Sequence, residues 1–72
     1  MSKFIIGHIY KYVGETTNQY PHKKFYLIGI PTPKQNLVSL AVYWLNEANK
    51  VAGVGAVDLA PQDVNNWVDE NG

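Results

Sequence analysis

The sequence predicts a small, mainly β domain of four to five short antiparallel strands, followed by a short C-terminal helix or 3₁₀ turn. Three observations lead to this fold class. Runs rich in β-branched and aromatic residues recur along the chain, turn-forming residues separate these runs, and apolar residues alternate with other residues within them. The chain has 72 residues, of which 46% are hydrophobic and 17% charged, so we expect residues 1–72 to form a single domain with one modest core.

Residues 4–13 form the first predicted strand, because they combine β-branched and aromatic side chains. Alternation places an aliphatic set on one face and a pair of tyrosines on the other: Ile5, Ile9 and Val13 against Tyr10 and Tyr12. The polar and turn-forming residues 14–22 then predict a long loop.

Residues 24–30 form the second predicted strand, which ends at Pro31 because proline cannot donate to a ladder. Its two faces alternate, with Phe25 and Leu27 against Tyr26, Ile28 and Ile30.

The next segment satisfies two periods. At a period of two, residues 37–45 form a strand with one face made of Val38, Leu40, Val42 and Trp44, and residues 46–49 close a hairpin. At a period of 3.6, the segment instead predicts a helix at about 37–52, which would make the fold α+β; its apolar stripe would consist of Leu37, Leu40, Ala41, Trp44, Leu45 and Ala48. We prefer the strand because short apolar runs bounded by turn residues suit a domain whose other segments are strands.

Residues 51–60 predict a further strand, in which Gly53 and Gly55 mark a bulge or a sharp bend. Pro61 suits the first position of a terminal helix or 3₁₀ turn. That turn is expected to present Val64, Trp67 and Val68 on one face, with Trp67 completing the core alongside Trp44 or Phe25.

Together these elements outline a small SH3-like barrel. Three short motifs resemble small bacteriophage and prophage accessory proteins with SH3-like folds: Gly7-His-Ile9-Tyr10, Lys24-Phe-Tyr26-Leu27-Ile28 and Val38-Ser-Leu40-Ala-Val42. The resemblance covers about half the chain. It implies a fold and an origin, and it assigns no functional residue.

No catalytic residue, metal site or cofactor is predicted, and we expect the protein not to be an enzyme. His8 and His22 lack the paired spacing of a zinc site, cysteine is absent, and Ser39 lies outside any nucleophile elbow. We expect His8 to be a partly exposed sheet residue, His22 a solvated loop residue and Ser39 a small residue on the less buried face. Four late carboxylates are expected to form a solvated, helix-starting or tail acidic face: Asp58, Asp63, Asp69 and Glu70.

The charge is unevenly distributed along a chain whose formal net charge is zero. Residues 1–36 hold five lysines against Glu15, whereas residues 37–72 hold Lys50 against five acidic residues. Arginine is absent, which argues against specific phosphate or guanine recognition. The lack of cysteine, of a signal peptide and of a membrane span predicts a cytoplasmic location.

The aromatic content favours a protein-binding role. Five tyrosines are expected to have at least partly exposed rings and to contact a partner: Tyr10, Tyr12, Tyr20, Tyr26 and Tyr43. The leading hypothesis is a non-enzymatic protein-binding module, a phage or mobile-element accessory protein that binds a host protein and inhibits or redirects it. We expect a monomer or a homodimer.

Two alternatives stay open. A single-stranded nucleic-acid-binding protein would stack bases on Tyr10, Tyr12 and Tyr26, and its backbone contacts would come from Lys3, Lys11, Lys23, Lys24 and Lys34. A structural protein would self-assemble through head-to-tail contact of its basic and acidic halves.

Overall fold

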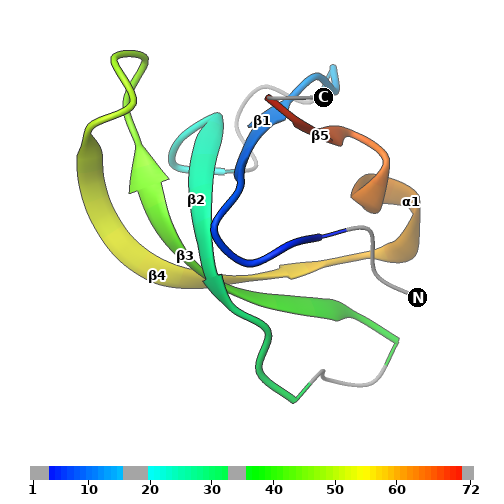
Figure 1. The fold of residues 1–72 in the computed structure, drawn as a ribbon. Coiled ribbons are helices and arrows are strands. Elements are labelled where there is room, and N and C mark those ends of the chain that lie inside the picture. Colours follow the sequence, from blue (N-terminus) through cyan, green and yellow to red (C-terminus); the bar gives the residue numbers. More distant parts are fainter. Residues whose placement is uncertain (1–3, 16–19, 33–35, 71–72) are drawn as a thin grey trace.

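The computed structural model describes residues 4–15, 20–32 and 36–70, and within them it shows a mainly β fold. The elements are β1 (Ile9–Tyr12), β2 (Lys24–Gly29), β3 (Val38–Leu45), β4 (Val51–Leu59), α1 (Pro61–Val64) and β5 (Trp67–Asp69). All pairings are antiparallel and the sheet order is β4-β3-β2-β1-β5, as Figure 1 shows. The predicted class of four to five antiparallel strands with a short helix is confirmed.

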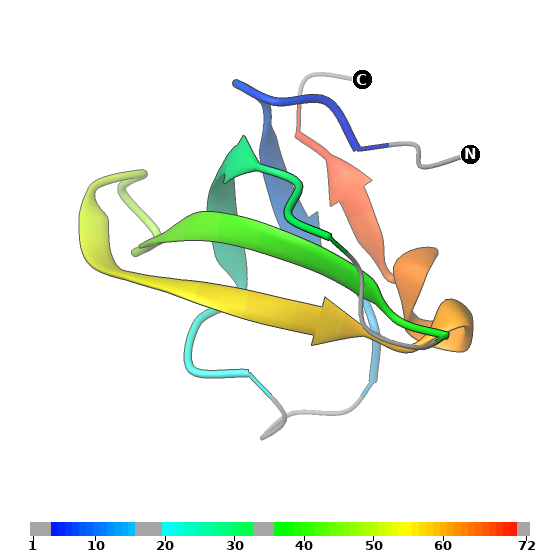
Figure 2. The same cartoon turned by 90° about the horizontal axis from the view of Figure 1, so that it is seen from below.

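The sheet coils strongly, but it does not close into a complete barrel. Its two edges are β4 and β5, and α1 connects them at one end of the molecule (Figure 2). The molecule therefore has an inner, concave side that holds the core and an outer side that faces solvent.

Aromatic and aliphatic side chains from all five strands fill the inner side. The buried cluster consists of Phe4, Tyr10, Tyr12, Phe25, Leu27, Leu40, Val42, Trp44, Val57, Leu59 and Trp67. Trp67 is fully buried, with ring centroids of Phe25 at 4.6 Å and Tyr12 at 5.1 Å. The predicted core positions of Trp67, Trp44 and Phe25 are confirmed.

Strand β3 answers the question that the sequence left open, and the helix at about 37–52 is wrong. β3 pairs with β2 along one edge and with β4 along the other, so it is a central strand of the sheet. Leu45 pairs with Val51 whereas Trp44 pairs with Gly53, so Ala52 is an extra residue and forms a bulge. The bulge lies next to Gly53, one of the two glycines that predicted it, whereas Gly55 pairs in regular register with Val42.

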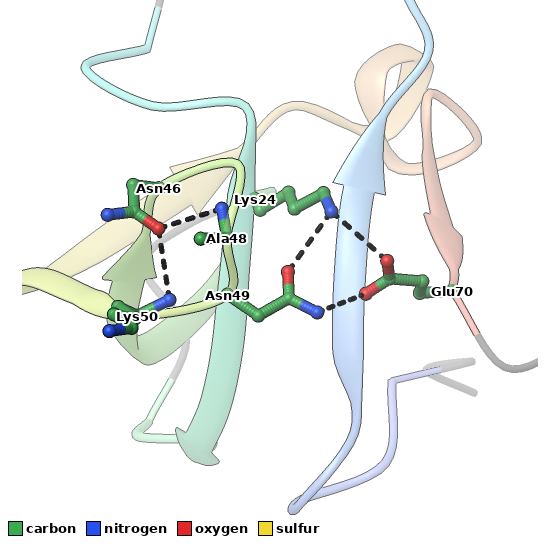
Figure 3. A network of polar contacts seen from close by, with 6 residues as sticks. All are labelled: Lys24, Asn46, Ala48, Asn49, Lys50 and Glu70. Atoms are coloured by element: carbon green, nitrogen blue, oxygen red, sulfur yellow. Dashed lines mark hydrogen bonds and ion pairs between the residues drawn. The ribbon is translucent and has the colours of Figure 1, made fainter.

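The predicted hairpin at residues 46–49 is confirmed. The Asn46 side-chain oxygen accepts the backbone N–H groups of Ala48 at 2.9 Å and Lys50 at 3.0 Å (Figure 3). Asn49 has a left-handed φ of 62°, which asparagine tolerates better than most residues.

The first strand is shorter than the predicted 4–13. Gly7 turns the chain with a φ of 94° and donates its N–H to the Leu27 carbonyl at 2.9 Å, so regular pairing begins only at Ile9.

The C-terminal segment differs from the expectation in one respect. Pro61 occupies the start of α1 as predicted, but Trp67 and Val68 belong to β5 and not to the helical turn. Here the chain pairs with β1, and the flanking bonds from Val13 N–H to Asn66 C=O (2.7 Å) and from Glu70 N–H to the Ile9 carbonyl (2.9 Å) extend the pairing. This tertiary pairing defines a strand of only three residues, too short to show a period in the sequence.

Candidate protein-interaction surface

Two of the five predicted contact tyrosines lie in the core. Tyr10 is 1% exposed and Tyr12 is 9% exposed, so the prediction that their rings face solvent is wrong. The alternation of the first strand was identified, but its faces were assigned the wrong way round, because Val13 and Ile5 are the exposed residues. Aromatic rings fill this core better than the aliphatic set, and the Tyr10 hydroxyl still accepts the Ile5 N–H at 2.8 Å.

Tyr20 also supports the scaffold. Its ring packs against Tyr12 and Trp67, with centroids 5.3 and 5.2 Å apart, and its hydroxyl donates to Asp63. Burial raises the pKa of the Tyr20 hydroxyl, and the hydrogen bond to Asp63 raises it further.

Asp63 lies in the first turn of α1, as one of the predicted alternatives had it, but its carboxylate is buried and not solvated. Besides Tyr20, its carboxylate accepts from the Tyr12 hydroxyl at 3.4 Å and from the Asn66 side-chain amide at 2.8 Å. We call these four residues the Asp63 cluster. It links β1, the loop before β2 and the chain after α1, which explains why a carboxylate is tolerated below the surface.

Tyr26 and Tyr43 remain on the outer side, as predicted. They are paired across β2 and β3, they are 36% and 39% exposed, and their rings stack with centroids 6.3 Å apart and an interplanar angle of 16°. Val54, in register with Tyr43 on β4, is 71% exposed. We call Tyr26, Tyr43 and Val54 the outer row, which is a continuous apolar surface across three strands.

Small side chains lie beside the outer row. Gly29 pairs with Ala41, and Ala41 with Ala56. Because these side chains are small, the outer surface of the sheet projects less here than at the stacked rings. Beyond them, Asp58 accepts the Ser39 hydroxyl at 2.7 Å. Ser39 lies on the less buried face of β3, as predicted, but is itself buried, whereas Asp58 is exposed.

On the other side of the outer row, a polar bridge crosses the sheet (Figure 3). The Lys24 ammonium donates to Asn49 Oδ1 at 3.0 Å and to Glu70 Oε1 at 3.1 Å. Asp69 lies 2.6 Å from the His8 ring nitrogen Nδ1. Glu70 and Asp69 therefore have specific partners instead of forming the solvated surface that the sequence predicted.

The same geometry bears on the nucleic-acid alternative. Of its three stacking residues only Tyr26 is exposed, and the charge of Lys24 is balanced by Glu70. Lys3 and Lys34 lie outside the described residues.

An open groove of about 430 Å³ is lined by Lys11, Tyr12, Pro21, His22, Lys23, Lys24, Leu45, Asn46 and Glu47. His22 is half-buried there, 6.3 Å from the Trp44 ring, and is not a fully solvated loop residue.

Within the described residues, no group of three or more His, Asp or Glu side chains is arranged to hold a metal ion. In the same part of the chain, no helix has the length and apolar character needed to span a membrane.

Comparison of the chain with protein-family models, curated proteins and solved structures gave no match. The likeness to phage accessory proteins therefore remains a prediction.

Proposed function

We propose that this protein is a non-enzymatic protein-binding module whose contact surface is the outer row. The observation that carries the proposal is the exposure of a stacked tyrosine pair next to Val54 on a sheet whose core is already complete. Large apolar side chains that a core does not need and that lie together on one face are typical of protein interfaces.

The composition of the outer row suits a protein partner. Tyrosine rings are large and rigid, so they lose little side-chain entropy on binding, and their hydroxyls still form hydrogen bonds. The low surface at Gly29, Ala41 and Ala56 offers space for a side chain of the partner beside the rings. A host protein as the partner, bound so as to inhibit or redirect it, stays a prediction.

The proposal is tested by affinity capture from a lysate of the organism that encodes the protein, with and without nuclease. The wild-type protein is compared with Tyr26→Ser/Tyr43→Ser, and the matched control is Ile5→Ser/Ile6→Ser, which removes two apolar side chains that are even more exposed but lie elsewhere. We expect one nuclease-resistant protein to be retained by the wild-type protein and the control and to be lost with the tyrosine variant.

The nucleic-acid alternative gives a different pattern. Retained material would then disappear after nuclease treatment, and it would be lost with Lys11→Glu/Lys23→Glu. These two lysines are more informative than Lys24, because Lys24 already pairs with Glu70 and its replacement would disturb the fold. That result would refute the protein-binding proposal.

A further inference from the structure

The edge of β4 directs backbone hydrogen-bonding groups away from the sheet. The Asn46 N–H donates to the Lys50 carbonyl across the hairpin at 2.9 Å. The backbone N–H and C=O groups of the even-numbered residues of β3 therefore point towards β4. In an antiparallel sheet, the backbone groups of successive residues point alternately to one neighbouring strand and to the other. The backbone groups of the odd-numbered residues of β4, which pair with the even-numbered residues of β3, therefore point towards β3. The N–H and C=O groups of Val54, Ala56 and Asp58 consequently point to the open edge.

This edge lacks the features that usually prevent strand pairing. Natural edge strands are often protected by lysine, proline, a short length or a covering element. β4 is nine residues long, contains neither lysine nor proline, and among the described elements pairs with β3 alone. Its bulge lies near its start, so residues 53–59 are regular.

The side chains of Val54, Ala56 and Asp58 lie on the outer side of the sheet, where they would contact the side chains of an added strand. Val54 is the end of the outer row, Ala56 is small and exposed, and Asp58 presents an exposed carboxylate. A carboxylate accepts several hydrogen bonds, so its contact with Ser39 is compatible with a cationic neighbour on the next strand.

We propose that the open edge of β4 binds an extended segment of the partner protein by antiparallel strand addition, with a basic residue opposite Asp58 and a large apolar residue opposite Val54. This inference rests on the proposed function, since it assigns how the partner of the outer row is held. In such strand additions, main-chain hydrogen bonds supply affinity and alternate side chains supply specificity. The segment has the pattern basic-x-x-x-apolar when read from its N-terminus, because the added strand runs antiparallel to β4.

The first test uses a synthetic peptide, acetyl-Thr-Arg-Thr-Thr-Thr-Val-Thr-amide, titrated into the ¹⁵N-labelled protein. We expect shifts and slower hydrogen exchange at the amides of Val54, Ala56 and Asp58. Replacing the peptide arginine by glutamate is expected to weaken binding about tenfold, which corresponds to about 1.4 kcal/mol. N-methylation of the peptide residues that face β4 is expected to abolish binding. Shifts confined to other strands would overturn the proposal.

The second test changes the protein. Ala56→Pro removes an N–H that points to the open edge and leaves the bonds to β3 in place, whereas Ala56→Val keeps the N–H and serves as the matched control. We expect Ala56→Pro to lose the peptide and Ala56→Val to retain it. If Ala56→Pro does not fold, the N-methylated peptide removes the same hydrogen bonds from the other strand and decides the question.

The two proposals fail in different ways. If the captured partner is lost with Tyr26→Ser/Tyr43→Ser but retained by Ala56→Pro, the outer row binds the partner and the strand-addition proposal is wrong. If neither variant affects capture, both proposals are wrong. Concentration-dependent dimerisation in analytical ultracentrifugation that Ala56→Pro abolishes would identify a second copy as the occupant of the edge and would overturn the assignment to a partner protein.

Discussion

Replacing Asp63 by alanine is expected to destabilise the fold substantially. The change removes the acceptor of the Tyr12 and Tyr20 hydroxyls and of the Asn66 amide. Asn66 is only half-buried, so water can replace its bond, and the Tyr12 contact of 3.4 Å is long. A hydrogen bond to a charged group contributes about 1.5–3 kcal/mol. Counting the Tyr20 bond in full and the long Tyr12 bond at a reduced value, we expect a loss of about 2–4 kcal/mol for the two tyrosines together.

That loss is a large share of the stability of so small a domain, since about 0.05–0.15 kcal/mol per residue is usual. It corresponds to a fall in Tm of about 10–25 °C. The measurement is thermal and urea unfolding followed by circular dichroism, with Glu47→Ala, an exposed acidic residue, as the control. A double-mutant cycle with Tyr20→Phe should show a coupling energy of about 0.5–3 kcal/mol. If Asp63→Ala melted within about 2 °C of the control, the argument that this cluster anchors the loop and α1 would be refuted.

Three further predictions concern local features. Gly14→Ala should lower stability by about 1–3 kcal/mol, because the new Cβ would overlap the packed Tyr12 ring. The control Gly53→Ala should change the urea midpoint little, because its Cβ would meet no other atom, and equal midpoints for the two variants would contradict this reasoning. Because the pKa of Tyr20 is raised in the folded state, the unfolded state loses the Tyr20 proton first, and stability should fall as the pH rises above about 10. This fall should be smaller in Tyr20→Phe, and identical pH profiles of the two proteins would contradict the assignment. Asn46→Ala should cost about 1 kcal/mol in urea unfolding because two hairpin N–H groups lose their acceptor, and an unchanged midpoint would show that water replaces it.

The strands that the sequence predicted best are those in which local pattern and tertiary environment agree. In β2 and β3 the apolar period of two coincides with one buried face, so Phe25 and Trp44 were placed correctly, and Pro61 marked the start of α1. The hairpin followed from the clustered turn residues before Lys50.

Where the prediction was wrong, the deciding interaction was non-local. In the first strand both faces are apolar or aromatic, so alternation alone could not indicate that Tyr10 and not Ile5 faces the core. β5 exists because it pairs with β1 near the other end of the chain, and Asp63 is buried because tyrosines from distant segments donate to it. The excess of tyrosine was the only available signal for such polar contacts in the core, and it was interpreted as an interface.

The pairing of β1 with β5 determines how the molecule opens. Tyr10 lies opposite Asp69, so this ladder joins segments from the two ends of the described chain, and Trp67, the largest fully buried side chain, enters the core through it. Detaching β5 withdraws Trp67 from the rings of Phe25 and Tyr12 and at the same time leaves β1 paired only with β2. A local opening of this ladder thus removes much of the core. We therefore expect the amides of β1 and of Val68, which face a ladder partner, to exchange with solvent only through global unfolding. We expect opening fluctuations of lower free energy on the β4 side of the sheet, where the outer row and the open edge lie.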